Sequence, residues 1–469
     1  MKARVLLICP STAIKIFKES KISVAIPHIP YLSLAALAAA LLDDGYPTQI
    51  LDLSISQEPL KDLDLSLKRF QPNFVGITFT TGLLKDASDL VNRIKSFDNS
   101  IKVIAGGVHS SIFPAEVVEK HNFDFAVFGE GEITLLELVS GKALETIDGL
   151  AYRDNQNKVV VNKRRELIED LDSLPYPAFY LYNSKNYHCP RITSKKSPVV
   201  AIETSRGCWG NCIFCNKHVF QRRVRAKSAK RVVDEMEMVL NLGYKEIHIW
   251  DDCFSAALDH PKKICDEILR RELKVCWNIY NGIRVDRVDE ELLIKLKAAG
   301  CYQVSFGIES GDQQVLNRSR KGITLEQTRN AVKLAKKVGI DVLGFFMIGL
   351  PGETPESIQR TIEFAKELDV DLPKVGIATP LPGTEFFDEW NQRGLILSYD
   401  WSDYTFHTTK RIAKYPELPE EIFGYYNTFY RKLYLRPSFM WKRFWRGLKT
   451  GQIFFDVYYF MKIFLRFKW

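Results

Sequence analysis

The sequence lacks the two short motifs that most often bind nucleotides in chains where strands alternate with helices. No Gly-x-Gly-x-x-Gly follows the first predicted strand, Arg4–Cys9, and no Gly-x4-Gly-Lys-Ser/Thr occurs. The first absence argues against a nicotinamide dinucleotide, and the second argues against a nucleoside triphosphate. A different cofactor is therefore expected.

The sequence also lacks the marks of a secreted protein. It has nine cysteines, an odd number, and no charged-then-apolar leader at its N-terminus. Both features argue against a disulfide scaffold and favour a reducing cytoplasm. We therefore expect a cytoplasmic, oxygen-sensitive protein. Six cysteines are scattered singly, where free Cys packs as a small hydrophobe: Cys9, Cys189, Cys253, Cys265, Cys276 and Cys301.

Acidic residues are nearly absent from the C-terminal tail, residues 431–469. This tail holds ten Lys/Arg and one acid, Asp456, and thirteen of its thirty-nine residues are aromatic. Its charges interrupt every long apolar run, so a spanning helix is not expected. One interpretation is peripheral contact with the inner membrane face, since basic residues and Trp suit an anionic surface. The other is a helical pair packed on the barrel with a basic outer face; nucleic acid is not favoured, because no binding module is recognisable.

The remaining three cysteines, Cys208, Cys212 and Cys215, lie within eight residues and indicate one metal site. A cubane iron–sulfur cluster takes four cysteine ligands when it is saturated, so three thiolates would leave one iron free to bind a substrate. Structural zinc is the alternative. Zinc normally closes its tetrahedron with a fourth Cys or His, and only His218 is nearby.

The first 145 residues predict a doubly wound parallel sheet of the Rossmann-like type. Strand-length apolar runs alternate with helical periodicity, as at Tyr31–Asp43. The predicted strands are Arg4–Cys9, Thr48–Ser54, Phe74–Phe79, Lys102–Gly107 and Phe123–Gly129. Ligands of such sheets sit at the carboxyl ends of the strands. The candidate residues at those ends are Thr12, Thr78, Gly106, Gly107, His109, Gly129 and Glu130.

A second α/β unit is predicted over residues 196–400, after a Pro-rich aromatic linker at 146–195 and before a helical region at 401–469. Six βα steps predict a partial (β/α)6 barrel of the TIM type, whose chemistry lies at the carboxyl ends of the strands. The predicted strands are Val199–Thr204, Glu246–Asp251, Val275–Asn281, Gln303–Ile308, Val342–Ile348 and Lys374–Ala378.

The C-x3-C-x2-C loop, with a β-branched strand and a Gly before it and Phe214 before the last Cys, resembles the cluster loop of the radical S-adenosylmethionine (SAM) enzymes. The resemblance implies a [4Fe-4S] cluster held by the three cysteines, with SAM on the fourth iron. In that family the reduced cluster cleaves SAM to a 5′-deoxyadenosyl radical, which abstracts hydrogen from an unreactive C–H bond. An electron donor such as flavodoxin or ferredoxin is implied as a partner.

The same resemblance gives the later strand ends a role in binding SAM. Asp251 and Asp252 are expected to accept hydrogen bonds from the methionyl ammonium, and Glu309 from the ribose hydroxyls. Arg284 ends the third strand, and Arg318 could meet the carboxylate. Gly349 lies in a Gly-Leu-Pro-Gly-Glu segment that resembles the adenine side. Each signal alone is weak, because an acid at a strand end is as often a helix cap.

The first unit resembles the cobalamin-binding domain of the cobalamin-dependent radical SAM enzymes. The resemblance rests on Pro27-His-Ile-Pro-Tyr-Leu-Ser-Leu-Ala, Ile50-Leu-Asp, Val75-Gly-Ile-Thr, Ala105-Gly-Gly-Val-His and Gly129-Glu-Gly-Glu. It implies that the corrin lies over the strand ends and that Gly106 and Gly107 let its nucleotide tail pass. No Asp-x-His-x-x-Gly occurs, so the cobalt is expected to lack a lower His ligand.

Together these resemblances favour methylation of an unactivated carbon in a small-molecule or lipid-like substrate. Relatives with the same two cofactors carry out ring formation or rearrangement, so a cyclase acting on a tetrapyrrole or lipid, like the magnesium-protoporphyrin monomethyl ester cyclase, is the alternative. An alternative of another class is a cobalamin-binding regulator with a silent barrel. The intact three-cysteine loop argues against the regulator.

Overall fold

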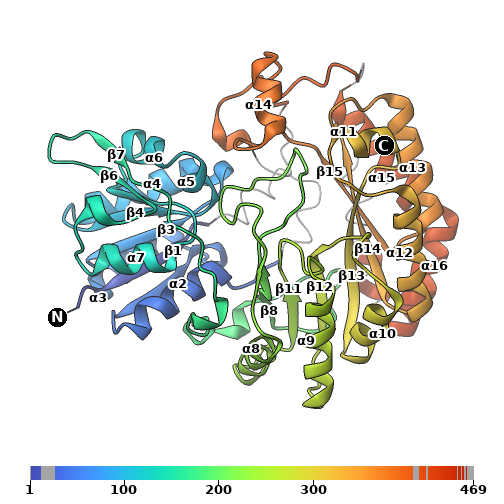
Figure 1. The fold of residues 1–469 in the computed structure, drawn as a ribbon, viewed down its shortest axis with the longest axis horizontal. Coiled ribbons are helices and arrows are strands. Elements are labelled where there is room, and N and C mark those ends of the chain that lie inside the picture. The colour runs from blue at the N-terminus through green and yellow to red at the C-terminus, as the bar shows by residue number, and fades with distance from the viewer. Residues whose placement is uncertain are drawn as a thin grey trace.

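The computed structural model describes residues 2–11, 27–404, 411–418, 421–451, 453–455, 457–458 and 461. Two α/β units lie side by side, the first blue to cyan and the second green to orange in Figure 1, and red helices follow on the second unit. The expected fold class, a Rossmann-like sheet followed by a partial barrel and a helical C-terminus, is confirmed.

The first unit is a seven-stranded sheet of order β2-β1-β3-β4-β5-β6-β7. Its strands are β1 (Val5–Cys9), β2 (Thr48–Asp52), β3 (Phe74–Thr78), β4 (Lys102–Gly106), β5 (Phe125–Val127), β6 (Leu150–Arg153) and β7 (Val159–Val161). Its helices are α2 (Leu32–Asp43), α3 (Pro59–Phe70), α4 (Leu84–Phe97), α5 (Val108–Ile112), α6 (Pro114–Lys120) and α7 (Glu132–Val139). The first five strands run parallel, as predicted.

Alternation along β1 explains why helices cover both faces of this sheet. Val5, Leu7 and Cys9 share a core with residues of α2 and α7. Leu6 and Ile8 point the other way and share a core with residues of α3 and α4. Every residue of β1 is buried, as expected for a parallel strand covered on both faces. The strand ends are then the part of the sheet that can meet a ligand.

The sheet continues into the segment predicted to be a linker. β6 and β7 add an antiparallel hairpin to the edge at β5, so residues 150–161 belong to the first unit. Asp154 holds the turn, since its carboxylate accepts hydrogen bonds from the backbone N–H groups of Gln156 and Lys158. Two apolar runs separated by such a turn are a hairpin signal, which a search for longer periodicity misses.

The second unit is a six-stranded parallel sheet of order β15-β14-β13-β12-β11-β8. Its strands are β8 (Val199–Ile202), β11 (Glu246–Ile249), β12 (Trp277–Ile283), β13 (Cys301–Glu309), β14 (Asp341–Ile348) and β15 (Leu372–Ile377). Its helices are α8 (Ala229–Asn241), α9 (Asp259–Arg270), α10 (Glu290–Ala298), α11 (Gln313–Arg318), α12 (Leu325–Val338) and α13 (Pro355–Leu368). The edge strands β8 and β15 do not pair, so the predicted partial barrel of six strands is confirmed.

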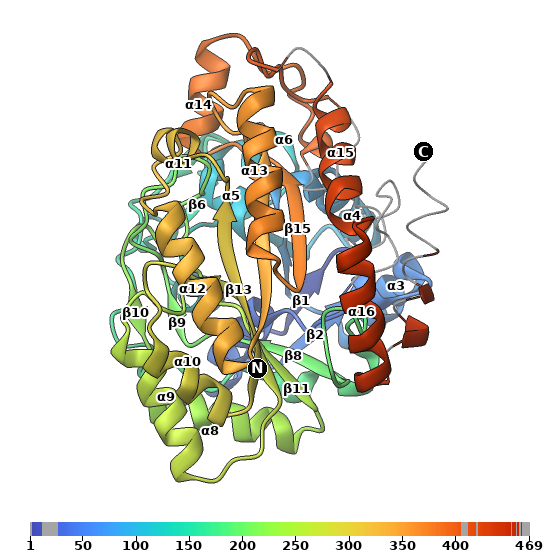
Figure 2. The same cartoon turned by 90° about the vertical axis from the view of Figure 1, so that its right-hand side faces the viewer.

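The C-terminal region contains α14 (Glu385–Gln392), α15 (Ile422–Tyr434) and α16 (Pro437–Thr450). α15 packs against the barrel, with Phe429 and Leu433 buried in the barrel core. Figure 2 shows α15 and α16 in red along one flank, beside α13. In the described part of the chain, no helix combines the length and the apolar character needed to cross a bilayer.

Candidate active site

The cluster loop, residues 207–224, follows β8 at the carboxyl end of the barrel strands. Two short antiparallel strands, β9 (Ser205–Arg206) and β10 (Arg225–Ala226), form its base. Gly207 opens the loop with φ +89°, and a Cβ there would collide with the carbonyl oxygen of Arg223. Only glycine fits this crossing. Further along, the Ile213 N–H donates to the Ser319 carbonyl oxygen at 3.2 Å, which braces the loop against the end of α11.

The three predicted cluster ligands differ in exposure. Cys212 is buried, Cys208 is partly buried and Cys215 is exposed. A Cβ on Gly210 would lie 3.3 Å from Cys208 Sγ and 3.9 Å from Cys212 Sγ, so these two sulfurs flank one point. Within the described ranges of this metal-free structure, no three His, Cys, Asp or Glu side chains converge closely enough to hold a metal ion.

Two of the thiols favour the thiolate form that binds metals. A hydrogen bond from Cys253 lowers the pKa of Cys208 to about 6, helped by the Gly210 N–H and Arg284. A hydrogen bond from Cys215 lowers the pKa of Cys212 to about 7 despite burial, and Lys321 adds to the effect. The pKa of Cys215 is raised in turn. Thiolates on a short loop, with a lysine and an arginine beside them, suit an anionic iron–sulfur cluster.

Asp251 and Asp252 tie the cluster loop to the end of β11. Asp251 is buried and accepts hydrogen bonds from the Thr204 N–H and Oγ1, both at 2.6 Å, and from Ser205 Oγ at 2.7 Å. Asp252 accepts one from the Gly207 N–H at 2.9 Å. Burial raises the pKa of Asp251 to about 6, although these hydrogen bonds oppose it. The predicted acceptors for the methionyl ammonium thus hold the loop that carries the cysteines.

Arg284 and Glu309 lie near the cysteines on neighbouring strands. The Arg284 guanidinium lies 4.6 Å from the ring centre of Trp209, inside the cluster loop, and pairs with Asp286 at 2.8 Å. Glu309 Oε1 lies 2.7 Å from Lys321 Nζ, and both side chains are largely buried. Arg284, Glu309 and Lys321 thus place charged groups beside the cluster loop, where the amino and carboxylate groups of an amino acid could bind them.

Arg318 is the last residue of α11, which follows β13, and Gly349 directly follows the next strand, β14. Arg318 Nη1 donates to the Gly352 carbonyl oxygen at 3.2 Å. Gly349 has φ +89°, and a Cβ there would lie 2.7 Å from the Tyr415 ring. Its N–H donates to Glu353 Oε2 at 2.5 Å. Tyr415, from the C-terminal region, thus covers the predicted adenine side.

The predicted cobalamin residues occupy the strand ends of the first unit. Thr78 ends β3, and Gly106 ends β4. Gly107 has φ +94°, and a Cβ there would lie 2.7 Å from the Phe79 carbonyl oxygen and 3.0 Å from Thr78 Oγ1. Gly129 follows β5 with φ +82°. Gly107 is therefore required by the turn itself, whereas a Cβ on Gly106 would come no closer than 3.8 Å to the Ile77 carbonyl oxygen and leaves space at the end of β4. Thr12 lies outside the described residues.

His109 lies beneath this edge and is fully buried. Its Nδ1 is 3.2 Å from Thr81 Oγ1, and its ring packs against Phe113 and Trp401. Burial lowers its pKa to about 4, so the imidazole is neutral near pH 7. The second ring nitrogen, Nε2, and the neighbouring Ser110 Oγ are buried and have no hydrogen-bond partner among the residues that the structure describes. Orphaned polar atoms beside an open strand end are consistent with a ligand there.

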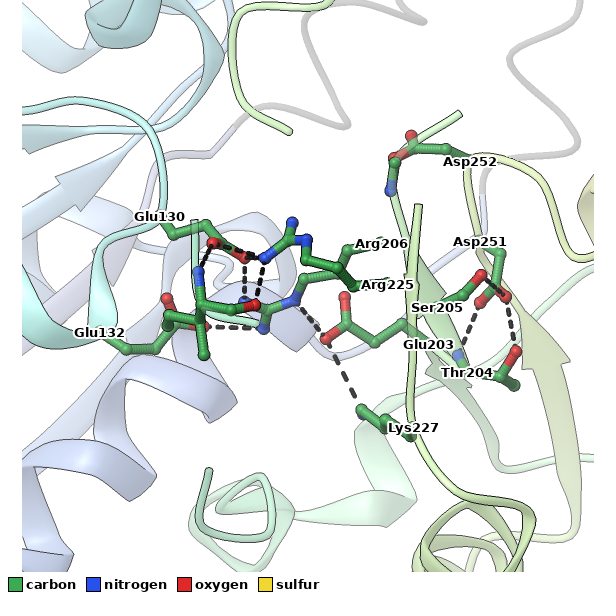
Figure 3. Close-up of polar contacts among 12 residues, drawn as sticks. Glu130, Glu132, Glu203, Thr204, Ser205, Arg206, Arg225, Lys227, Asp251 and Asp252 are labelled. Carbon is green, nitrogen blue, oxygen red and sulfur yellow. Dashed lines mark hydrogen bonds and ion pairs between the residues drawn. The ribbon is translucent and has the colours of Figure 1, made fainter. Parts of the chain in front are cut away.

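A buried ion-pair network joins the first unit to the cluster loop (Figure 3). Glu130 and Glu132 follow β5, and Arg206 lies two residues before Cys208. Arg206 Nη1 is 2.8 Å from Glu130 Oε1, and its Nη2 is 2.7 Å from Glu132 Oε1. Arg225 Nη1 is 2.7 Å from Glu130 Oε2. None of these four side chains is more than 8% exposed, so the contacts are shielded from water and salt.

The network continues into the barrel. Arg206 Nε is 2.8 Å from Glu203 Oε1, and Lys227 Nζ is 3.0 Å from Glu235. Arg231 also pairs with Glu235 at 3.0 Å. Burial alone would raise the pKa of Glu203, but Arg206 and Lys227 hold it below its usual value. Glu203 is therefore a carboxylate, and the network is charged.

The sequence matches two family profiles in the order of the two units. Residues 25–139 match the B12 binding domain, and residues 202–365 match the radical SAM superfamily. An uncharacterized methyltransferase of Pyrococcus horikoshii is 35% identical over 421 residues, which cover 88% of this chain and 89% of the relative. The chain belongs to the cobalamin-dependent radical SAM enzymes.

Two further relatives show the range of this family. The cytidylyl-2-hydroxyethylphosphonate methyltransferase of Streptomyces wedmorensis is 30% identical over 84% of this chain and 82% of its own length. The anaerobic magnesium-protoporphyrin IX monomethyl ester cyclase of Rubrivivax gelatinosus is 30% identical over 80% and 68%. TsrM of Kitasatospora setae, solved with cobalamin and a [4Fe-4S] cluster, shares the fold at a TM-score of 0.71, with 20% identity over 93% of this chain and 90% of that one.

Membership in this family confirms the predicted cofactors, a [4Fe-4S] cluster, SAM and cobalamin, and sets aside the regulator with a silent barrel. The donor set of the cluster loop fits a cluster, and the space beside Gly106 at the end of β4 fits a ligand that approaches the backbone closely, as a corrin would. In this cobalamin-dependent radical SAM enzyme, sequence reasoning missed Arg206 and Arg225. The signal available was an Arg directly before the Gly-Cys of the loop, but its partners at Glu130 and Glu132 are more than seventy residues away.

Proposed function

We propose that the protein transfers a methyl group to an unactivated carbon of a small-molecule or lipid-like substrate. The observation that carries the proposal is the pair of relatives named as methyltransferases, both of at least 30% identity and aligned over more than 80% of their length. The cyclase of Rubrivivax gelatinosus supports ring formation as the second candidate, with a shorter share of its length aligned.

In this proposal Cys208, Cys212 and Cys215 hold the cluster. When bound, the cluster and SAM supply a radical that abstracts hydrogen, and cobalamin supplies a transferable methyl group. Thr78, Gly106, Gly107 and Gly129 face the corrin, together with Thr12 beyond the described residues, and the backbone at the glycines admits its tail. Phe214, next to Cys215 in the sequence, is partly buried and packs against the apolar cluster that includes Phe386 and Trp390 of α14.

The SAM site in this proposal combines Arg284, Glu309, Arg318 and Gly349. Arg284 and Arg318 would meet the carboxylate, and Glu309, held by Lys321, would accept from ribose hydroxyls. Asp251 and Asp252 serve this site by fixing the cluster loop through the Thr204 and Gly207 N–H groups. An electron donor such as flavodoxin or ferredoxin would reduce the cluster.

Glu130 is proposed to act on the corrin indirectly. Its carboxylate is already engaged by Arg206, Arg225 and the Ile168 N–H at 2.8 Å. Through these contacts it sets the distance between the strand ends of the first unit and the cluster loop. A methyl group crossing from one cofactor to a substrate radical needs reacting atoms within a few ångströms, so this distance is part of the chemistry.

A label on the methyl group of SAM distinguishes methyl transfer from ring formation. The reconstituted enzyme is incubated anaerobically with reductant, a metabolite and lipid extract, and SAM whose methyl group carries deuterium. We expect a product that contains the labelled methyl group and whose formation stops in the Cys212→Ala variant. A new product without the label would instead establish the cyclase or rearrangement reaction.

A further inference from the structure

The amino end of the barrel, opposite the cluster loop, carries a basic cavity of ≈ 910 Å³. It lies where β13 and β14 begin, under the C-terminal helix α16. Five cationic side chains line it: Arg191, Lys195, Lys297, Lys442 and Arg446. Barrel chemistry is confined to the carboxyl ends of the strands, so this cavity has no part in the reaction.

Two of the five cations are neutralised by carboxylates. Lys442 Nζ is 3.1 Å from Asp369 Oδ2 and 3.5 Å from Asp371 Oδ1. Arg446 pairs with Asp371 at 3.1 Å and also with Asp341. These contacts hold α16 against the first residue of β14 and the segment that leads into β15.

The other three cations have no carboxylate partner within the described ranges. Lys195 Nζ lies 4.2 Å from the ring centre of Tyr302. Lys297 Nζ donates to the Gly339 carbonyl oxygen at 2.5 Å, and Arg191 donates to the Lys195 carbonyl oxygen. The cavity therefore keeps an excess of positive charge, and Lys195 and Lys297 are exposed at its rim. An anionic group would be bound there.

The outer face of α16 is aromatic. Trp441, Phe444, Trp445 and Leu448 recur at spacings of three and four, which places them on one face of the helix. Trp441 is 64% exposed, and each of the other three is at least 44% exposed. Beyond the helix, Phe454 is also exposed, at 83%. Water-exposed aromatics in such a row mark an interaction surface.

The aromatic face and the basic cavity are continuous, because Trp445 belongs to both. Figure 1 shows α16 at the right-hand edge of the molecule, on the side of the second unit that lies away from the first unit. An interfacial helix places aromatic side chains at the boundary between headgroups and acyl chains, with basic side chains at the phosphates. A flat protein partner would not need both features side by side.

We propose that α16 and the basic cavity form a docking surface for an anionic phospholipid bilayer. The headgroup phosphates lie against Lys195 and Lys297, and Trp441 and Phe444 enter the interface. The helix lies along the membrane surface, since it has fourteen residues and bonds to the barrel through Lys442 and Arg446. The proposal is independent of the methyl transfer proposed above.

Sedimentation with vesicles tests this surface. The full chain is mixed with vesicles of phosphatidylcholine alone or of phosphatidylcholine with phosphatidylglycerol. We expect binding to the anionic vesicles only, weakened by salt. A Lys195→Gln/Lys297→Gln variant should bind about 30-fold more weakly, since each basic residue near an anionic surface contributes about fivefold. Trp441→Ala/Phe444→Ala should lose about tenfold or more.

The matched control is Lys68→Gln/Lys85→Gln, which removes the same charge from exposed positions on α3 and α4 of the first unit. It should bind as the unaltered chain does. Three results would each overturn the proposal. The control could lose as much vesicle binding as Lys195→Gln/Lys297→Gln, or the chain could bind neutral and anionic vesicles equally. The chain could also bind no vesicles and retain only inorganic phosphate. Circular dichroism should show all variants folded, because the altered side chains are exposed.

Discussion

Replacing Glu130 by alanine should loosen the first unit from the cluster loop. The carboxylate is almost fully buried, with 2% of its side chain exposed, and it holds Arg206 and Arg225 at 2.7–2.8 Å. Without it, Arg206 retains Glu132 and Glu203, but Arg225 keeps no carboxylate partner among the described residues and is left with the Ile168 carbonyl oxygen and the Phe220 ring. Removing one partner of a buried ion pair costs about 3–5 kcal/mol, because the remaining charge stays buried.

The matched control is Glu169→Ala. Glu169 pairs with Arg223 at the same 2.8 Å distance and in the same part of the chain, but both side chains are more than half exposed. Exposed pairs contribute about 0–1 kcal/mol. We expect the first transition of urea unfolding to shift clearly in Glu130→Ala and little in Glu169→Ala.

Limited proteolysis adds a readout of domain separation. In Glu130→Ala, cleavage in the connector after β7 should speed up before the units unfold, because local opening at the interface becomes cheaper. Cobalamin bound by the first unit should remain, since Glu130 is not proposed to touch it. Equal unfolding midpoints for the two variants, or loss of cobalamin without faster cleavage, would refute the assignment of Glu130 to the interface.

Two further predictions concern single residues. Gly207→Ala should lower the thermal midpoint and the iron content more than Gly141→Ala does. Both glycines have positive φ, but a Cβ at 207 would collide with the Arg223 carbonyl oxygen, whereas nothing lies within 4 Å of one at 141. Equal thermal midpoints and equal iron content in the two variants would contradict this reasoning. Burial raises the pKa of Glu353 to about 8, so the folded chain holds a proton that the unfolded chain loses above its usual pKa near 4.5. The stability that Glu353 contributes to the folded chain is therefore fully present below the unfolded-state pKa near 4.5 and is lost as the pH rises toward 8. Glu353→Gln should remove the loss, with a gain on the order of a few kcal/mol at alkaline pH, and parallel stability–pH curves for the two proteins would contradict this.

Much of the fold could be predicted because it rests on local pattern. Every residue of β1 is buried, and its alternating contacts with two layers of helices give the continuous apolar run that marks a parallel strand. The six barrel strands follow the same logic. Strand ends were less exact, as at β5, where Phe123–Gly129 was predicted and Phe125–Val127 is found, because pairing partners decide where a ladder ends.

The site was predictable where its residues share a short motif. The three cysteines lie on one loop, so their spacing indicated one metal site, and the resemblance of the loop to the radical SAM family indicated the cluster. The contacts of Glu130 and Asp251 were not predictable, because they depend on how distant segments meet. Asp251 turns back to Thr204 and Ser205, and Glu130 turns away from the first unit toward β9 and β10. An acid at a strand end indicates a polar edge but not the partner that occupies it.

The most direct test of radical SAM chemistry at this loop is the release of 5′-deoxyadenosine. The protein is reconstituted anaerobically with iron, sulfide and hydroxocobalamin, then given SAM and reductant, beside Cys212→Ala and the control Cys276→Ala, a cysteine outside the loop. We expect 5′-deoxyadenosine and S-adenosylhomocysteine from the unaltered chain and from Cys276→Ala, and neither from Cys212→Ala. Unchanged iron content and unchanged products in Cys212→Ala would contradict the account.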